Sequence, residues 1–137
     1  MTTSETLELL YVIDTHALIW YLLGDKKLSN KARAVFEAGE RGDARLVLPA
    51  VVLAELYFAN VKNKWFPDFK TVYTTLAAHN AYTLLPFESR HVLEFDADAK
   101  VPEMHDRIIV GVARRLRAPL VTSDPLIVAA DIVPTVW

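Results

Sequence analysis

The sequence contains no cysteine, which excludes disulfides, thiolate metal sites and a cysteine nucleophile. Its 4 glycines and 7 prolines stand apart from one another, and there is no internal repeat, low-complexity tract or flexible linker. It also lacks an excess of positive charge: the net charge is −2, so no general basic field points to a polyanionic partner. Any binding of nucleic acid must therefore depend on a local patch or on a metal ion.

Long apolar runs are absent as well. No stretch approaches the roughly 20 residues that a membrane-spanning helix needs, and the opening MTTSETLE carries an acid where a signal peptide would have positive charge. We therefore expect a cytoplasmic protein with no membrane partner. The 137 residues, 53% of them hydrophobic, suffice for one core, so we predict a single domain over 1–137 in which about residues 1–8 form a flexible arm.

What the sequence does contain is an alternation of apolar strands with helical patterns. Short apolar runs predict strands at 9–13, 46–48, 82–87, 120–122 and 132–137. Helical spacing and capping residues predict helices at 17–23, 30–38, 49–62, 69–79, 90–98 and 106–117, with a short turn from Pro125. The helix 49–62 is apolar nearly all round, so we expect it to be central. The alternation favours an α/β fold with about five parallel strands in three layers.

Four acids stand where solvated surface acids are not expected. Asp14 and Asp124 follow predicted strands, and ligand sites of open parallel sheets lie beyond the carboxyl ends of the strands. Glu55 interrupts the apolar run VVLAELYFA, and Asp106 opens a predicted helix at the edge of its apolar stripe. Each acid also has a structural reading: the aspartates suit helix N-termini or turns, and Glu55 suits a partly exposed face or an ion pair with an arginine.

If the four carboxylates converge, a bound cation has to offset their repulsion, because like charges a few ångströms apart cannot all stay ionised in a poorly solvated pocket. No lysine or arginine lies within three residues of Asp14, Glu55 or Asp124, so a divalent metal is the simplest neutraliser. An all-oxygen site suits Mg²⁺ or Mn²⁺ better than zinc. Such ions lower the pKa of a bound water and stabilise a phosphodiester under attack, which points to phosphodiester hydrolysis.

Four stretches spread over the chain carry a family resemblance: VIDTHALIW (12–20), LPAVVLAELYFA (48–59), MHDRIIVGVARRLRAPLVTSDPLI (104–127) and VPTVW (133–137). Together they resemble the PIN-domain family of nucleases, and within it the VapC-type toxins of toxin–antitoxin pairs. The resemblance implies a PIN-like three-layer α/β/α sandwich with a five-stranded parallel sheet. It also implies Mg²⁺- or Mn²⁺-dependent endoribonuclease activity on RNA, inhibition by a separately encoded cognate antitoxin, and a homodimer.

The resemblance also carries a set of site residues onto this sequence. The metal ligands and catalytic residues would be Asp14, Glu55, Asp106 and Asp124. Asp14 and Asp106 would be the principal ligands, Glu55 would assist them or orient the attacking water, and Asp124 would complete the set. Two hydroxyls, of Thr15 and Ser123, could hydrogen-bond these carboxylates or a bound water.

Basic side chains near these motifs have two readings. Arg107, Arg114 and Arg117 lie on roughly the same side of their helix as Asp106, since successive residues turn by about 100°. They could hold RNA phosphates or antitoxin acids, with Arg107 preferred, or they could form a solvated basic face. His16 could take part in RNA binding or proton transfer, although a structural hydrogen bond is the favoured reading.

Two further groups of side chains are interpreted mainly as structural. The large aromatics are expected in the core, with a base-stacking platform or an antitoxin groove as the alternative: Trp20, Tyr57, Phe58, Trp65 and Phe66. The stretch 60–68 is the first candidate for a partner surface. The remaining polar candidates, Glu103, His105, Asp96 and Asp98, are expected to be structural, the last two as solvated loop residues.

Three other functions compete with the nuclease reading. A phosphoacceptor receiver domain would need a lysine near a late strand end, and no lysine follows Lys100. A haloacid-dehalogenase-like phosphatase would need a second acid two residues after Asp14, where this chain has His16. A catalytically inactive PIN-fold module that binds nucleic acid or protein stays open, but clustered carboxylates without a metal would destabilise the fold.

Overall fold

The computed structural model describes residues 9–137, and the arm predicted at about 1–8 lies outside the described residues. Its strands are all parallel and form one sheet in the order β3-β2-β1-β4-β5, which confirms the predicted five-stranded parallel sheet. The strands are β1 (Leu9–Ile13), β2 (Ala44–Pro49), β3 (Tyr82–Leu85), β4 (Leu120–Val121) and β5 (Thr135–Val136).

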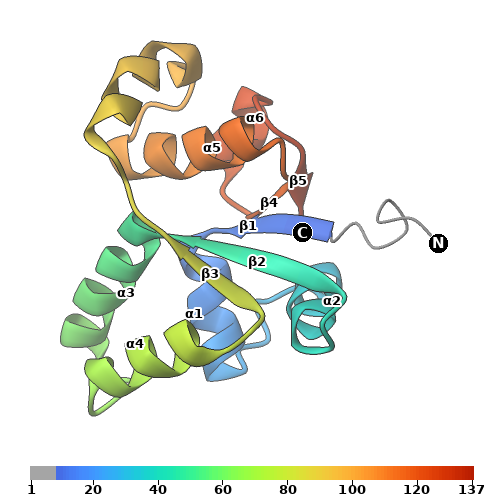
Figure 1. Cartoon of the computed structure of the whole chain (residues 1–137), viewed down its shortest axis with the longest axis vertical. Coiled ribbons are helices and arrows are strands. Elements are labelled where there is room, and N and C mark those ends of the chain that lie inside the picture. Colours follow the sequence, from blue (N-terminus) through green and yellow to red (C-terminus); the bar gives the residue numbers. More distant parts are fainter. Residues whose placement is uncertain (1–8) are drawn as a thin grey trace.

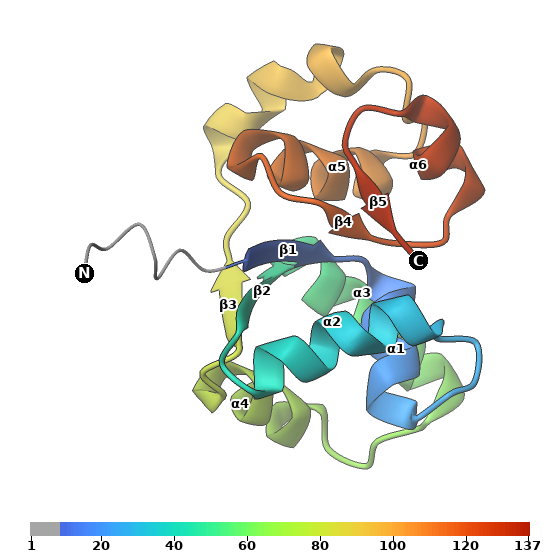
Figure 2. The ribbon, with the colours of Figure 1, turned by 90° about the vertical axis from the view of Figure 1, so that its right-hand side faces the viewer.

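Helices cover both faces of the sheet, so the three-layer α/β/α arrangement is confirmed (Figure 1). One face carries α1 (Thr15–Leu23), α2 (Asn30–Glu40), α3 (Ala50–Asn63) and α4 (Phe69–Ala78). The other carries the 3₁₀ helix η2 (Ser89–Asp98), α5 (Met104–Leu116) and α6 (Pro125–Ala130), as Figure 2 also shows. Within residues 9–137, none of the helices combines the length and apolar character that a bilayer span requires.

The strand order reverses at β1. The chain passes from β1 to β2 and β3 on one side and then returns to add β4 and β5 on the other side. In open α/β sheets, a crevice forms outside the carboxyl ends of the strands at such a reversal. The register pairs Ile13 with Val121, so the residues that follow these two fully buried side chains leave the sheet side by side.

Several element boundaries differ from the sequence-based expectation. α1 begins at Thr15 rather than at 17, because the Asp14 side chain caps its first turn, as one of its two readings predicted. α5 begins at Met104 rather than at 106, because Glu103 supplies the cap. Pro49 ends β2 instead of opening the helix, and β5 covers only two residues of the predicted 132–137.

The prediction that the apolar helix after Pro49 is central was wrong. Only one stripe of α3 is buried, formed by Val52, Leu56 and Asn60. Tyr57 is 45% exposed and Phe58 is 70% exposed, so the opposite side of the helix presents apolar side chains to solvent. Periodicity shows that a helix can be buried, but tertiary packing decides which of its faces finds a partner.

Candidate active site

A cavity of about 360 Å³ lies at the reversal point of the sheet, and all four predicted acids line it. They come from four separate places: the end of β1, the second turn of α3, the first turn of α5, and the residue that caps α6. The structure therefore brings together four carboxylates that are far apart in the sequence: Asp14, Glu55, Asp106 and Asp124. The buried Ile19 and the half-buried Ala59 form an apolar part of the wall.

Asp14 is the most buried of the four acids, with 5% of its surface exposed. Its Oδ1 accepts a hydrogen bond of 2.6 Å from the Thr15 backbone N–H, and its Oδ2 accepts one of 2.5 Å from the Thr122 hydroxyl. Burial raises the pKa of Asp14 above its usual value, and these two hydrogen bonds partly oppose that change. The Asp14 side chain thus both caps α1 and lines the cavity.

Glu55 is held from both sides. The Thr15 hydroxyl donates a hydrogen bond of 2.5 Å to Oε1, which is the kind of contact expected for Thr15. On the other side, His105 Nδ1 lies 3.4 Å from Oε2. The sequence predicts an arginine as the ion-pair partner of Glu55, and the structure places the His105 imidazole beside it instead.

The pKa of Asp106 reflects the burial and the negative charge of the cavity. Its pKa rises from 3.8 to about 7, first because burial disfavours the charged form and then because of the nearby negative charges, chiefly those of Asp124 and Asp14. A carboxyl group in this position cannot ionise at low cost without a neighbouring positive charge. The repulsion inferred from the sequence is therefore present in the folded chain.

The hydroxyl that joins the two strand-end acids belongs to Thr122, not to Ser123. Thr122 is 1% exposed, donates to Asp14 Oδ2, and accepts a 3.0 Å hydrogen bond from the Asp124 backbone N–H. Ser123 is exposed. Because successive residues of an extended chain point to opposite sides, two neighbouring hydroxyls cannot both reach Asp14. Asp124 itself caps α6 by accepting from the Leu126 backbone N–H at 2.8 Å.

Glu103 and His105 also belong to this neighbourhood, although both are expected from the sequence to be structural. Glu103 lines the cavity, and its Oε2 lies 3.4 Å from His105 Nδ1. Glu55, Glu103 and His105 each offer one ligand atom, and these atoms all lie within 4.8 Å of one another. The useful signal is that both residues lie within three positions of Asp106, Glu103 as the N-cap of α5 and His105 in its first turn.

The arginines of α5 point to another part of the protein. Arg107 donates to the Val101 carbonyl at 2.8 Å, and Arg114 pairs with Asp98 through an Nε–Oδ1 contact of 2.7 Å. Arg114 follows Asp106 by eight residues, which places it roughly 12 Å further along the helix. Both side chains are engaged with other parts of the chain here, and their binding of RNA phosphates stays a prediction. Asp98 is 1% exposed, so its expected role as a solvated loop residue was wrong.

His16 lies at the acidic cavity, and the aromatic residues differ in their burial. His16 is exposed, lines the acidic cavity, and its ring centroid lies 5.6 Å from that of Trp20. Trp20 packs against Trp137, as a core reading requires. The core reading was wrong for the exposed rings, of which Phe58 at 70% is the most accessible.

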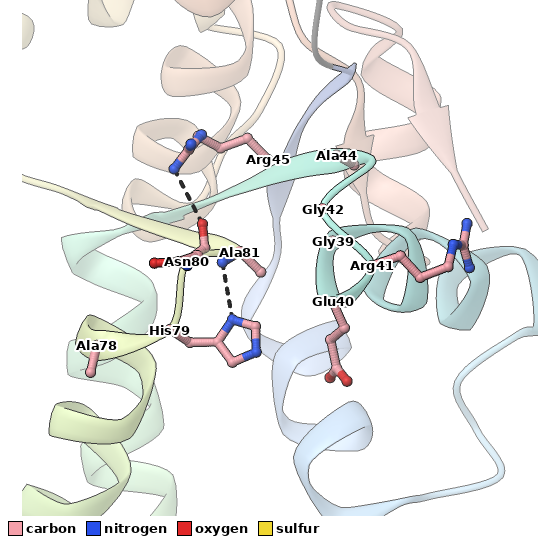
Figure 3. Close-up of a pocket in the computed structure, with 10 residues that line it drawn as sticks. All are labelled: Gly39, Glu40, Arg41, Gly42, Ala44, Arg45, Ala78, His79, Asn80 and Ala81. Atoms are coloured by element: carbon pink, nitrogen blue, oxygen red, sulfur yellow. Dashed lines mark hydrogen bonds between the residues drawn. The ribbon is translucent and has the colours of Figure 1, made fainter.

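A larger cavity of about 690 Å³ lies at the opposite, amino-terminal ends of β2 and β3 (Figure 3). Its polar groups mostly hold the chain in its turns: His79 Nδ1 accepts from the Ala81 backbone N–H at 3.0 Å, and Arg45 donates to the Asn80 carbonyl. Glu40 supplies carboxylate oxygens to this lining, whereas five acids line the smaller cavity. The set of donor atoms, rather than volume, therefore identifies the smaller cavity as the candidate site.

Three of the solved structures that share this fold are described here. VapBC2 from Rickettsia felis, bound to a DNA fragment from their promoter, gives a TM-score of 0.69 at 14% identity, covering 93% of this chain and 97% of that chain. DNA-bound VapBC from Salmonella typhimurium gives 0.63 at 17% identity, with 93% and 96% covered. FitAcB from Neisseria gonorrhoeae gives 0.61 at 18% identity, with 91% and 95% covered.

Identities this low show a shared fold alone. A comparison with curated protein sequences gave no match. The family model of the PIN domain, however, matches residues 11–132, which include all four acids of the cavity. The match spans most of the chain and agrees with the observed sheet and layers. This chain therefore belongs to the PIN-domain family.

Proposed function

We propose that this chain is a single PIN domain that cleaves RNA as a Mg²⁺- or Mn²⁺-dependent endoribonuclease, and that it is the VapC-type toxin of a toxin–antitoxin pair. The observation that carries the proposal is the meeting of Asp14, Glu55, Asp106 and Asp124 around one cavity. The fold is shared with chains of VapBC and FitAB assemblies, which supports an antitoxin as partner. A cytoplasmic homodimer is the working state that we infer for it.

The carboxylates that line the cavity offer the oxygen donors that a hard divalent ion prefers. Their ligand atoms are carboxylate oxygens, which suit Mg²⁺ and Mn²⁺, and the pKa of Asp106 is raised to about 7 by burial and by the other acids. A dication would remove that repulsion. The four acids would hold the ion, which when bound supplies charge stabilisation at the phosphodiester and a more acidic water.

The chain's own side chains would prepare the site for hydrolysis. Asp14 is kept in one orientation by the Thr15 N–H and the Thr122 hydroxyl, so it needs little rearrangement on binding. Glu55, fixed between Thr15 and His105, is positioned to orient the attacking water or accept its proton.

The proposal is tested with purified protein and mixed RNA. We expect cleavage with Mg²⁺ or Mn²⁺, none with chelator, and none for Asp14→Asn or Asp106→Asn proteins that still fold by circular dichroism. Asp96→Asn is the matched control, because Asp96 is an exposed acid of η2 outside the cavity, and it should cleave like the wild type. Metal-independent cleavage, or full activity of Asp106→Asn, would overturn the proposal. Binding of RNA without cleavage would favour an inactive PIN-fold binding module.

A further inference from the structure

The acidic cavity repels the backbone of the substrate that we propose for it. Five carboxylates line the cavity, and its lining contains no lysine or arginine. Proteins normally hold the phosphates of a nucleic acid with such basic side chains. Three arginines of α5 already contact other parts of the chain: Arg107, Arg114 and Arg115. A cation that holds the RNA backbone beside the site is therefore to be sought outside the lining and outside this helix.

A row of side chains leads from the cavity to such a cation. His16 is exposed and lines the cavity, and its ring centroid lies 5.6 Å from that of Trp20. The ammonium of Lys27 lies over the Trp20 ring, 5.8 Å from its centroid. Lys27 is exposed and, within residues 9–137, forms no ion pair with a carboxylate. The row thus joins the acidic cavity to an ammonium group that can accept an anion.

We propose that this strip, made of His16, Trp20 and Lys27, binds the RNA strand on one side of the cleaved phosphodiester. The Lys27 ammonium binds a backbone phosphate, and the His16 imidazole stacks on a base between that phosphate and the cavity. The inference rests on the proposed RNA cleavage, and it assigns the path by which the substrate leaves the site. The strip contains no residue of α3, so it does not use the exposed apolar side of that helix.

The strip runs in the direction that a strand leaving the site would take. The cap of α1 is Asp14, so the helix begins at the acids and extends away from them. Trp20 follows His16 by one turn, which is about 6 Å further along the helix. A strand whose cleaved phosphodiester lies at the acids therefore passes His16 first and reaches the Lys27 ammonium beyond it.

Trp20 is a fixed support for both contacts. Its half-buried ring packs edge-on against Trp137, at a centroid distance of 5.7 Å. An ammonium held over an indole face is attracted by the ring and keeps its other side open to an anion. Because Lys27 is already oriented by this contact, it loses less side-chain freedom when a phosphate binds.

The chemistry of the strip favours RNA over a protein segment. A docked amphipathic helix would need an apolar stripe, whereas His16 and Lys27 are polar and exposed. An acidic protein segment could pair with Lys27, but its carboxylates offer no flat ring to His16. A single-stranded RNA supplies a phosphate and an unpaired base at every nucleotide, and both are recognised by such side chains.

The phosphate contact is tested with Lys27→Ala, Lys27→Arg and the control Lys70→Ala. Lys70 is an exposed lysine of α4 that does not line the acidic cavity. Fluorescence anisotropy measures the binding of a labelled oligouridine in Ca²⁺ over a range of salt concentrations. Lys27→Ala should reduce the steepness of log binding constant against log salt by about 0.7, the value for one phosphate contact on a single strand. Lys27→Arg and Lys70→Ala should keep the wild-type slope, and an unchanged slope in Lys27→Ala would overturn the inference.

The stacking contact is tested with His16→Ala and His16→Phe. His16→Ala should raise the Kd for oligouridine by about 5- to 150-fold, the range for loss of one stacked base. His16→Phe keeps a flat ring and should bind like the wild type. An abasic oligomer of the same length should bind equally well to all three proteins. Equal binding of oligouridine by His16→Ala and the wild type, or equal losses in both variants, would contradict stacking.

These measurements need no cleavage, so they separate the inference from the proposed function. Weaker RNA binding by Lys27→Ala and His16→Ala supports the strip even if no nuclease activity is found. Cleavage by a wild type whose RNA binding neither substitution changes leaves the proposed function standing and overturns the strip. Variants that bind RNA normally but escape inhibition by the co-expressed antitoxin would assign these residues to a protein partner, which also overturns it.

Discussion

Replacement of Asp106 by asparagine should stabilise the metal-free protein at alkaline pH, although it removes a residue of the candidate site. The pKa of Asp106 rises from 3.8 to about 7 in the folded chain, through burial and the charges of the neighbouring acids. A difference of this size corresponds to about 4 kcal/mol. Asp106 is only half-buried, so solvent screens part of the repulsion, and we expect a gain of about 2 kcal/mol in the free energy of unfolding.

The pH dependence of this gain follows from the direction of the pKa change. An acid with a higher pKa in the folded state binds its proton more tightly there, so its ionisation destabilises the fold. The destabilisation is absent below pH 3.8, grows as the pH rises, and is complete above about pH 7. The advantage of Asp106→Asn over the wild type should therefore be largest at pH 8 and less than about half as large at pH 5.

Urea denaturation followed by circular dichroism, with chelator present, measures this difference at both pH values. Asp96→Asn serves as the control and should match the wild type at each pH, because this acid is exposed on η2. Addition of Mn²⁺ at about 100 times its Kd should stabilise the wild type by about 2.7 kcal/mol and reverse the order of the two proteins. The reasoning is refuted if Asp106→Asn is no more stable than the wild type at pH 8, or if its advantage is equal at pH 5.

Two further substitutions separate structural roles by chemical denaturation. Thr122→Val should lower the free energy of unfolding by about 1–3 kcal/mol, because it removes a buried hydroxyl that hydrogen-bonds Asp14 and the Asp124 N–H. Ser123→Ala should change the free energy of unfolding by less than about 0.5 kcal/mol. Equal effects of the two substitutions would contradict the structural role given to Thr122. Arg114→Ala should cost about 3–5 kcal/mol, because it leaves Asp98 buried without its cation. The folded Arg114→Ala protein should keep its KM for RNA. A raised KM would instead support the phosphate-binding role that the sequence predicts for this arginine.

The sheet and its layers could be predicted because their signals are local. Continuous apolar runs such as LLYVI at 9–13 mark strands of a parallel sheet, although only Val12 and Ile13 of this run are buried, and intervening helical periods mark the crossovers. Caps were also readable in the sequence: Ser29 accepts from the Ala32 N–H as an N-cap does. The less accurate boundaries lie where a polar side chain outside the apolar pattern starts the helix, as Glu103 does for α5.

The individual contacts of the site could not be predicted in the same way. Which of two adjacent hydroxyls reaches Asp14 depends on where β4 ends, and in the structure it is Thr122 rather than Ser123. The partner of Glu55 depends on how α3 lies against the start of α5, and that gave His105 rather than an arginine. A helical projection places Arg114 near the angle of Asp106 but omits its distance along the axis.

The sequence by itself determined the alternation of strands and helices that produces a parallel α/β sheet. It also identified four acids whose burial in apolar surroundings would cost free energy without a compensating charge. Both conclusions follow from the hydrophobicity of neighbouring residues. The tertiary structure alone decided that these acids share one cavity, because the register of Ile13 with Val121 and the packing of α3 and α5 join residues that are distant along the chain. It also decided that the apolar helix α3 keeps one side in solvent, because burial of a face requires a partner surface, and periodicity within a helix does not specify one.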